Sequence, residues 1–90
     1  MEQTRKLDGR VAIVTGAGSS GPGIGTGKAI SVLFAREGAK VVLVDKFEDR
    51  ANETLRLIEG EGGTATVVIA DLAEVPACQH VVDEAVARYG

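Results

Sequence analysis

The sequence predicts an α/β fold in which a parallel sheet alternates with helices. Three short apolar runs rich in β-branched residues indicate strands over 11–14, 41–44 and 65–70. These runs are continuous rather than alternating, which is typical of strands covered on both faces. Segments with helical spacing lie between and after them, and helices that cross between strands require parallel pairing with right-handed connections. The expected unit is therefore βαβαβα with strand order 3-2-1, half of a doubly wound sheet.

The first helix is expected over 28–37, after a glycine-rich loop. Four of its apolar residues fall on one face, and Gly38 stands where a left-handed helix C-cap is expected. The residues expected on the inward face are Ala29, Ile30, Leu33 and Phe34.

Two further helices follow the second and third strands. The second carries Ala51, Leu55 and Ile58 at helical spacing and ends at the glycines of 60–63. In the third, Pro76 suits the first turn, where a missing N–H costs little. Its expected inward stripe consists of Val75, Cys78, Val82, Ala85 and Tyr89.

Composition limits the classes of protein. Ninety residues make at most one domain, residues 1–90, and 44% hydrophobic residues exclude a disordered chain. A net charge of −3 argues against nucleic acid as a partner. The single cysteine fits a reducing compartment, and neither a secretory signal nor a membrane-length apolar run is present. We expect a cytoplasmic protein that binds neither nucleic acid nor membrane.

A glycine-rich loop, residues 15–27, connects the first strand to the first helix. Glycines let the backbone turn tightly and approach a pyrophosphate, whose charge a helix N-terminus favours. The literal Gly-x-Gly-x-x-Gly of 16–21 would leave later glycines in the helix, each costing about 1 kcal/mol relative to alanine. We prefer a register with Gly16 as the turn glycine, 23–25 as the approach to the helix, and 19–22 as an enlarged loop. Glycines that serve only the turn and close packing are the alternative.

Asp45 closes the second strand, twenty residues after Gly25. A carboxylate there accepts hydrogen bonds from a free ribose 2′-hydroxyl and repels a 2′-phosphate, so it predicts NAD rather than NADP. Lys46 could partly offset that repulsion, and the alternative is that Asp45 is a surface acid. Strand, glycine loop, helix and terminal acid together predict a Rossmann-like dinucleotide site.

At these residues the chain resembles the short-chain dehydrogenase/reductase family. Residues 7–17 look like the family's opening strand and turn, and residues 35–42 its first helix-to-strand junction. Residues 23–25 look like the end of its Thr-Gly-x-x-x-Gly-x-Gly motif, although six residues rather than three separate the first two motif glycines. The cofactor-binding residues expected from the pattern and the resemblance are Gly16, Ser19, Ser20, Gly23, Ile24, Gly25, Asp45, Asp71 and Leu72.

In that family, the pair matching Asp71 and Leu72 contacts the adenine ring; Asp71 could instead cap the following helix. The resemblance implies hydride transfer between a nicotinamide and a small carbonyl or alcohol substrate, often in a homo-oligomer. The family's catalytic serine, tyrosine and lysine would lie beyond Gly90, so we expect no catalytic residue here and a segment cut before the fourth strand. We then expect an apolar free edge on the first strand, marginal stability and weak NAD binding.

Two other functions compete with this interpretation. Residues 25–28, Gly-Thr-Gly-Lys, suggest a phosphate-binding P-loop, but Pro22 and Ala29 occupy positions where that motif needs glycine and a hydroxyl. The second competing function is a nucleotide-binding module that catalyses no reaction.

Several tempting side chains have simpler interpretations. Cys78 and His80 do not share a helix face or form a metal site, so we expect Cys78 in the core and His80 in solvent. Tyr89 is expected to pack. The acids Glu48, Asp49 and Glu53 are expected on the solvated face and first turn of the second helix.

Overall fold

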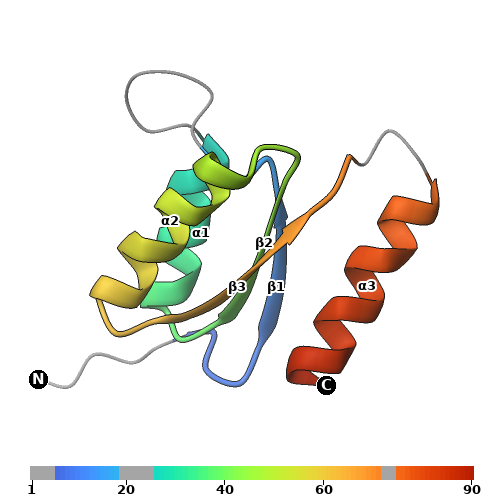
Figure 1. Cartoon of the computed structure of the whole chain (residues 1–90). Helices are drawn as coiled ribbons and strands as arrows, with labels where there is room; N and C mark the ends of the chain where they lie inside the picture. The colour runs from blue at the N-terminus through green and yellow to red at the C-terminus, as the bar shows by residue number, and fades with distance from the viewer. Residues whose placement is uncertain (1–5, 19–25, 72–74) are drawn as a thin grey trace, which may run out of the picture.

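The structure is a computed structural model that describes residues 6–18, 26–71 and 75–90. Strands and helices alternate along these residues, and α1 and α2 lie on one side of the sheet while α3 lies on the other (Figure 1). The elements are β1 (Val11–Thr15), α1 (Thr26–Arg36), β2 (Lys40–Asp45), α2 (Glu48–Gly60), β3 (Thr64–Ile69) and α3 (Val75–Tyr89).

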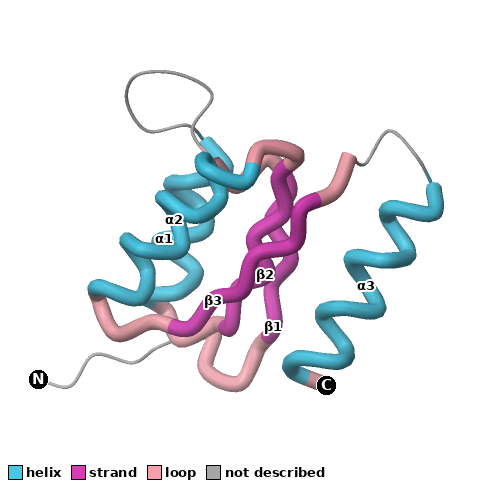
Figure 2. Tube along the Cα trace, viewed as in Figure 1, coloured by secondary structure: helices cyan, strands magenta, loops and turns pink. Residues whose placement is uncertain are grey.

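The three strands form one parallel sheet in the order β1-β2-β3, which confirms the predicted topology (Figure 2). Ala12 pairs with Val41 on one side of β2, and Val41 pairs with Ala65 on the other. The ends of the strands differ from the predicted ones by at most one residue. β2 is therefore the central strand, and its residues 41–44 are fully buried.

Two apolar cores form because successive side chains of a strand point to opposite faces. One core lies between the sheet and the pair α1 and α2, and it includes Val14, Val41, Leu43 and Ile58. The other lies under α3, where Val42, Val44 and Val68 meet Val81 and Ala85.

β1 is less covered than expected. Val11 and Ile13 are 40% and 43% exposed, on the same face of the sheet as α3. Among the described residues, β1 pairs with β2 alone. Coverage on both faces is thus confirmed for β2 and wrong for β1.

Glycine ends both α1 and α2 with the same hydrogen-bond pattern. Gly38 has φ of 97°, and the N–H of Ala39 donates to the Phe34 carbonyl at 3.1 Å. Gly62 has φ of 84°, and the N–H of Gly63 donates to the Ile58 carbonyl at 2.9 Å. This is the Schellman motif, so the predicted left-handed cap at Gly38 is confirmed.

The predicted inward face of α1 is wrong. Leu33 is 55% exposed, and Ile30 and Phe34 are also exposed, whereas Lys28, Ser31 and Ala35 are buried. Small residues on the buried face let the helix lie close to the sheet. The Ser31 hydroxyl is satisfied there because it donates to the Gly27 carbonyl at 2.7 Å.

The predicted stripe of α3 is also partly wrong. Cys78 and Val82 are exposed, while Val81 and Ala85 are buried and Tyr89 packs beside them; the Val75 side chain lies outside the description. Burial raises the pKa of the Tyr89 hydroxyl, a shift that nearby Arg88 partly opposes. The packing role of Tyr89 and the exposure of His80 are confirmed. In the described part of the chain no helix has the length and hydropathy needed to span a bilayer.

Candidate functional site

Three of the predicted site residues gather at one edge of the sheet. Gly16 follows β1, Asp45 ends β2 and Asp71 comes just after β3, and the carboxyl ends of parallel strands share an edge. The Ala70 N–H donates to the Asp45 carbonyl at 3.1 Å, which ties the end of β3 to that of β2. The six other predicted residues lie outside the described residues: Ser19, Ser20, Gly23, Ile24, Gly25 and Leu72.

The turn after β1 depends on two glycines, of which the sequence identified one. Gly16 has φ of 61°, a conformation that favours glycine. Gly27, in the first turn of α1, has no room for a side chain because a Cβ there would overlap the Gly16 carbonyl group. α1 begins at Thr26, two residues earlier than expected, so Gly27 lies within the helix, where a glycine is unfavourable on helix propensity alone.

Gly18 is also more than a loop residue. Its N–H donates to Asp45 Oδ2 at 3.0 Å, and a Cβ at position 18 would lie 2.8 Å from the backbone carbonyl carbon of Arg50. Glycine therefore lets the turn after β1 approach both the end of β2 and the first turns of α2. The literal Gly-x-Gly-x-x-Gly spacing of 16–21 includes Gly18. The contact of Gly18 with α2, however, depends on tertiary structure and is not visible in the sequence.

Asp45 is half-buried, and its carboxylate is held from two sides. Oδ2 accepts from Gly18, and Oδ1 accepts the N–H of Phe47 at 2.9 Å. An ionised carboxylate has about four acceptor positions, so each oxygen retains capacity for a second hydrogen bond. Asp71 is exposed, and its side chain lies at the same edge beyond β3.

Two positively charged side chains, one before α2 and one in its first turn, lie over the ring of Phe47. The Arg50 guanidinium lies 4.3 Å from the centroid of the Phe47 ring, and the Lys46 ammonium lies 5.5 Å from it. Phe47 is 44% exposed. The residue whose N–H binds the Asp45 carboxylate thus also carries an aromatic ring that contacts two cations.

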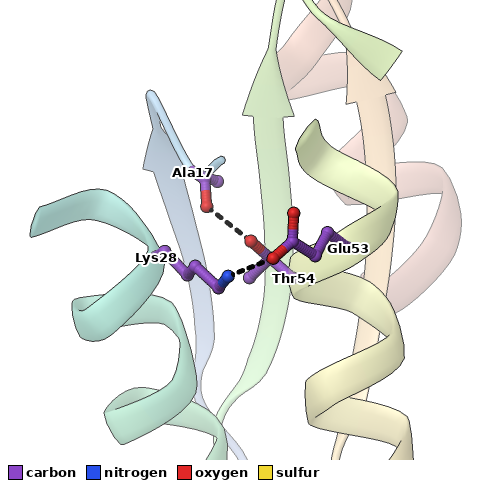
Figure 3. A network of polar contacts seen from close by, with 4 residues as sticks. All are labelled: Ala17, Lys28, Glu53 and Thr54. Atoms are coloured by element: carbon purple, nitrogen blue, oxygen red, sulfur yellow. Dashed lines mark hydrogen bonds and ion pairs between the residues drawn. The ribbon is translucent and has the colours of Figure 1, made fainter. Parts of the chain in front are cut away.

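α2 holds both sides of the glycine loop through two consecutive residues (Figure 3). Thr54 Oγ1 donates to the Ala17 carbonyl at 2.9 Å, and Lys28 Nζ donates to Glu53 Oε1 at 2.6 Å. The hydrogen bond and charge of Lys28 lower the pKa of the Glu53 carboxyl. Glu53 lies on the solvated face of α2 as expected, with its side chain 55% exposed, and it pairs with Lys28 in addition. Glu48 and Asp49 are exposed in the first turn of α2, also as expected.

Lys28 bears on the P-loop alternative. Its side chain is 7% exposed and its ammonium is paired with Glu53. In a P-loop the corresponding lysine binds phosphate, so this pairing argues against a P-loop. In the described residues, no cluster of three His, Cys, Asp or Glu side chains forms a metal site. The expected core position of Cys78 is wrong, since this thiol lies on the exposed side of α3.

Comparison with known proteins identifies the family of this chain. The family model described as short chain dehydrogenase matches residues 10–90. An uncharacterized oxidoreductase of Bacillus subtilis, YhxC, is 40% identical over 85 residues, which cover 93% of this chain and 28% of that protein. The chain spans about 30% of the length of the curated relatives that it matches.

Solved structures agree with the fold. A short-chain dehydrogenase/reductase from Burkholderia xenovorans superposes with a TM-score of 0.90 at 43% identity, over 98% of this chain and 34% of that one. A 7α-hydroxysteroid dehydrogenase, solved with NADH and 7-oxo glycochenodeoxycholic acid, superposes with a TM-score of 0.87 at 35% identity, over 100% of this chain and 34% of that one. The chain belongs to the short-chain dehydrogenase family, and it covers the N-terminal part that carries the strand, glycine turn and acid described above.

Proposed function

We propose that this chain binds a nicotinamide dinucleotide, prefers NAD to NADP, and forms the cofactor-binding part of an oxidoreductase. The observation that carries the proposal is the Asp45 carboxylate, which two backbone N–H groups fix at the carboxyl edge of the sheet. Its remaining acceptor capacity suits the hydroxyls of an adenosine ribose, and its charge opposes a 2′-phosphate.

The other residues of this edge have supporting roles. Gly16 and Gly18 bring the backbone close to the place where the pyrophosphate would meet the start of α1. We assign to Asp71, together with Leu72, the contact with the adenine ring, because Asp71 lies at the same edge of the sheet. From the glycine-rich loop, the residues that we propose to bind the cofactor are Ser19, Ser20, Gly23, Ile24 and Gly25.

The nicotinamide, when bound, accepts or supplies a hydride, and the whole protein would transfer it to or from a small carbonyl or alcohol carbon. The solved relative with NADH supports this cofactor class. We assign no catalytic residue within the ninety residues, so the chain itself is proposed to bind the cofactor without turning it over.

The test is the ratio of NADP to NAD dissociation constants in calorimetric titrations. Asp45→Ala removes the carboxylate, and we expect this ratio to fall at least about tenfold, the equivalent of one lost charge-assisted hydrogen bond. Asp49→Ala is the matched control because it removes an exposed acid from the first turn of α2 with the same change in net charge. A ratio that stays the same in Asp45→Ala would refute the role of Asp45.

A further inference from the structure

A single peptide unit, between Ala17 and Gly18, is hydrogen-bonded at both ends. Its carbonyl accepts the Thr54 hydroxyl at 2.9 Å, and its N–H donates to Asp45 Oδ2 at 3.0 Å. A peptide unit is planar, so its C=O and N–H turn together. A rotation that breaks the bond to Thr54 therefore also breaks the bond to Asp45.

Burial makes this arrangement stiff. Ala17 and Thr54 are both 0% exposed, and the Ala17 N–H donates to the Val44 carbonyl at 3.1 Å. Water cannot easily replace a hydrogen bond at a fully buried site, and leaving a buried carbonyl unpaired is unfavourable. The orientation of this peptide is thus fixed from α2, an element that the proposed cofactor site otherwise does not use.

We propose that Thr54 is a positioning residue for cofactor selection, a proposal that rests on the proposed function of Asp45. The Thr54 hydroxyl holds the Ala17–Gly18 peptide so that the Gly18 N–H fixes the Asp45 carboxylate. Without the hydroxyl, the peptide is free to rotate and Asp45 loses one of its two backbone donors. Recognition of the ribose 2′-hydroxyl and discrimination against a 2′-phosphate then weaken together.

Two variants at position 54 separate the hydroxyl from packing. Thr54→Val keeps the shape of the side chain and removes the donor, while Thr54→Ser keeps the donor. With the full chain and calorimetric titration of NAD and NADP, we expect Thr54→Val to lower the NADP-to-NAD ratio of dissociation constants by about fivefold to tenfold. Thr54→Ser is expected to stay within about twofold of the wild type. An unchanged ratio in Thr54→Val, or an equal loss in both variants, would overturn the proposal.

Amide hydrogen exchange on the ligand-free chain tests the same link without any dinucleotide. Thr54→Val should speed exchange at the Gly18 amide about tenfold, and leave the buried amides of β2 near wild-type rates. Thr54→Ser should leave exchange at the Gly18 amide near the wild-type rate. Faster exchange throughout β2, which would signal general destabilisation, or unchanged exchange at Gly18 would each contradict positioning by Thr54.

The two experiments fail in different ways. If the wild-type chain binds neither NAD nor NADP while exchange at Gly18 responds to Thr54→Val as expected, the proposed function fails and the link from Thr54 to Asp45 stands. In that case the role of Thr54 in cofactor selection is also refuted, because the chain binds neither cofactor. If the wild type binds with the expected preference and Thr54→Val does not change it, only the role of Thr54 is refuted.

Discussion

Gly27 lies so close to Gly16 that a Cβ at position 27 would overlap the Gly16 carbonyl group. The carbonyl carbon of Gly16 would stand 2.7 Å from that Cβ. Both neighbours are backbone atoms, which cannot move aside as a flexible side chain can. The first turn of α1 thus begins directly against the turn that ends β1, and this contact brings the helix N-terminus to the proposed pyrophosphate position.

Gly27→Ala should destabilise the chain by about 2 kcal/mol, because the helix must shift away from Gly16. Urea unfolding followed by circular dichroism measures this loss. Gly60→Ala is the control: position 60 ends α2, and a Cβ there meets no atom within 4 Å. It should be neutral or stabilising by up to about 1 kcal/mol. Equal stability of the two variants would contradict the close contact.

Gly38→Ala should cost more than Gly62→Ala, although both glycines have positive φ at the end of a helix. A Cβ at 62 meets open space, so only backbone strain of about 1–2 kcal/mol is expected. At 38 the Cβ would also overlap the Asp8 carboxylate and lie 3.0 Å from the Asp8 Cα. We expect at least about 1 kcal/mol of additional loss in thermal unfolding. Indistinguishable losses would show that the segment around Asp8 can move aside.

Stability should fall in acid as two ion pairs between the α1 and α2 regions are lost. Lys28 lowers the pKa of Glu53, and Arg36, whose guanidinium lies 2.8 Å from Glu61, lowers the pKa of Glu61. A depressed folded-state pKa gives a contribution that is complete above the ordinary value of 4.5 and is lost as the pH falls through the folded-state pKa.

The urea midpoint of the wild type should therefore drop more steeply below pH 4.5 than that of the double variant Glu53→Gln, Glu61→Gln. Both side chains are exposed, Glu53 by 55% and Glu61 by 41%, so the difference should be small and should shrink further in high salt. Parallel pH profiles of the two proteins would contradict these assignments.

The chain should self-associate through β1, whose edge away from β2 carries no described partner. Ile13→Lys places a charge on this strand and should reduce association in sedimentation velocity experiments. Leu57→Lys is the matched control, because Leu57 has the same exposure, 44% against 43%, but lies on α2. Equal effects of both variants would indicate nonspecific apolar association, and a monodisperse wild type that melts above about 60 °C would contradict the expected marginal stability.

Strands were easier to predict than helix faces. The run 41–44 is apolar on every residue, so it fits a central strand, and β2 extends it by only one residue at each end. α1 has apolar residues around most of its circumference, and spacing alone does not decide which side approaches the sheet. The choice follows from Ser31 and Ala35, which are small enough for close approach, and from Lys28, whose charge Glu53 neutralises.

Within the candidate site, sequence identified the residues that act through local geometry. Gly16 has its positive φ directly after a strand, and Asp45 ends the next strand. Gly18, Gly27 and Thr54 act through contacts with distant segments; Thr54 lies 37 positions from the carbonyl that it binds. Such contacts leave no periodic pattern, so they depend on the three-dimensional structure.

The strand order in space repeats the strand order along the chain. β2 and β3 therefore each have a partner strand that is already synthesised when they leave the ribosome, and neither waits for a later segment before it can pair. Loop closure over such short separations is inexpensive in entropy, which favours folding during translation from the N-terminus onward. The edge with Gly16, Asp45 and Asp71 would then assemble while the rest of a longer polypeptide was still being made.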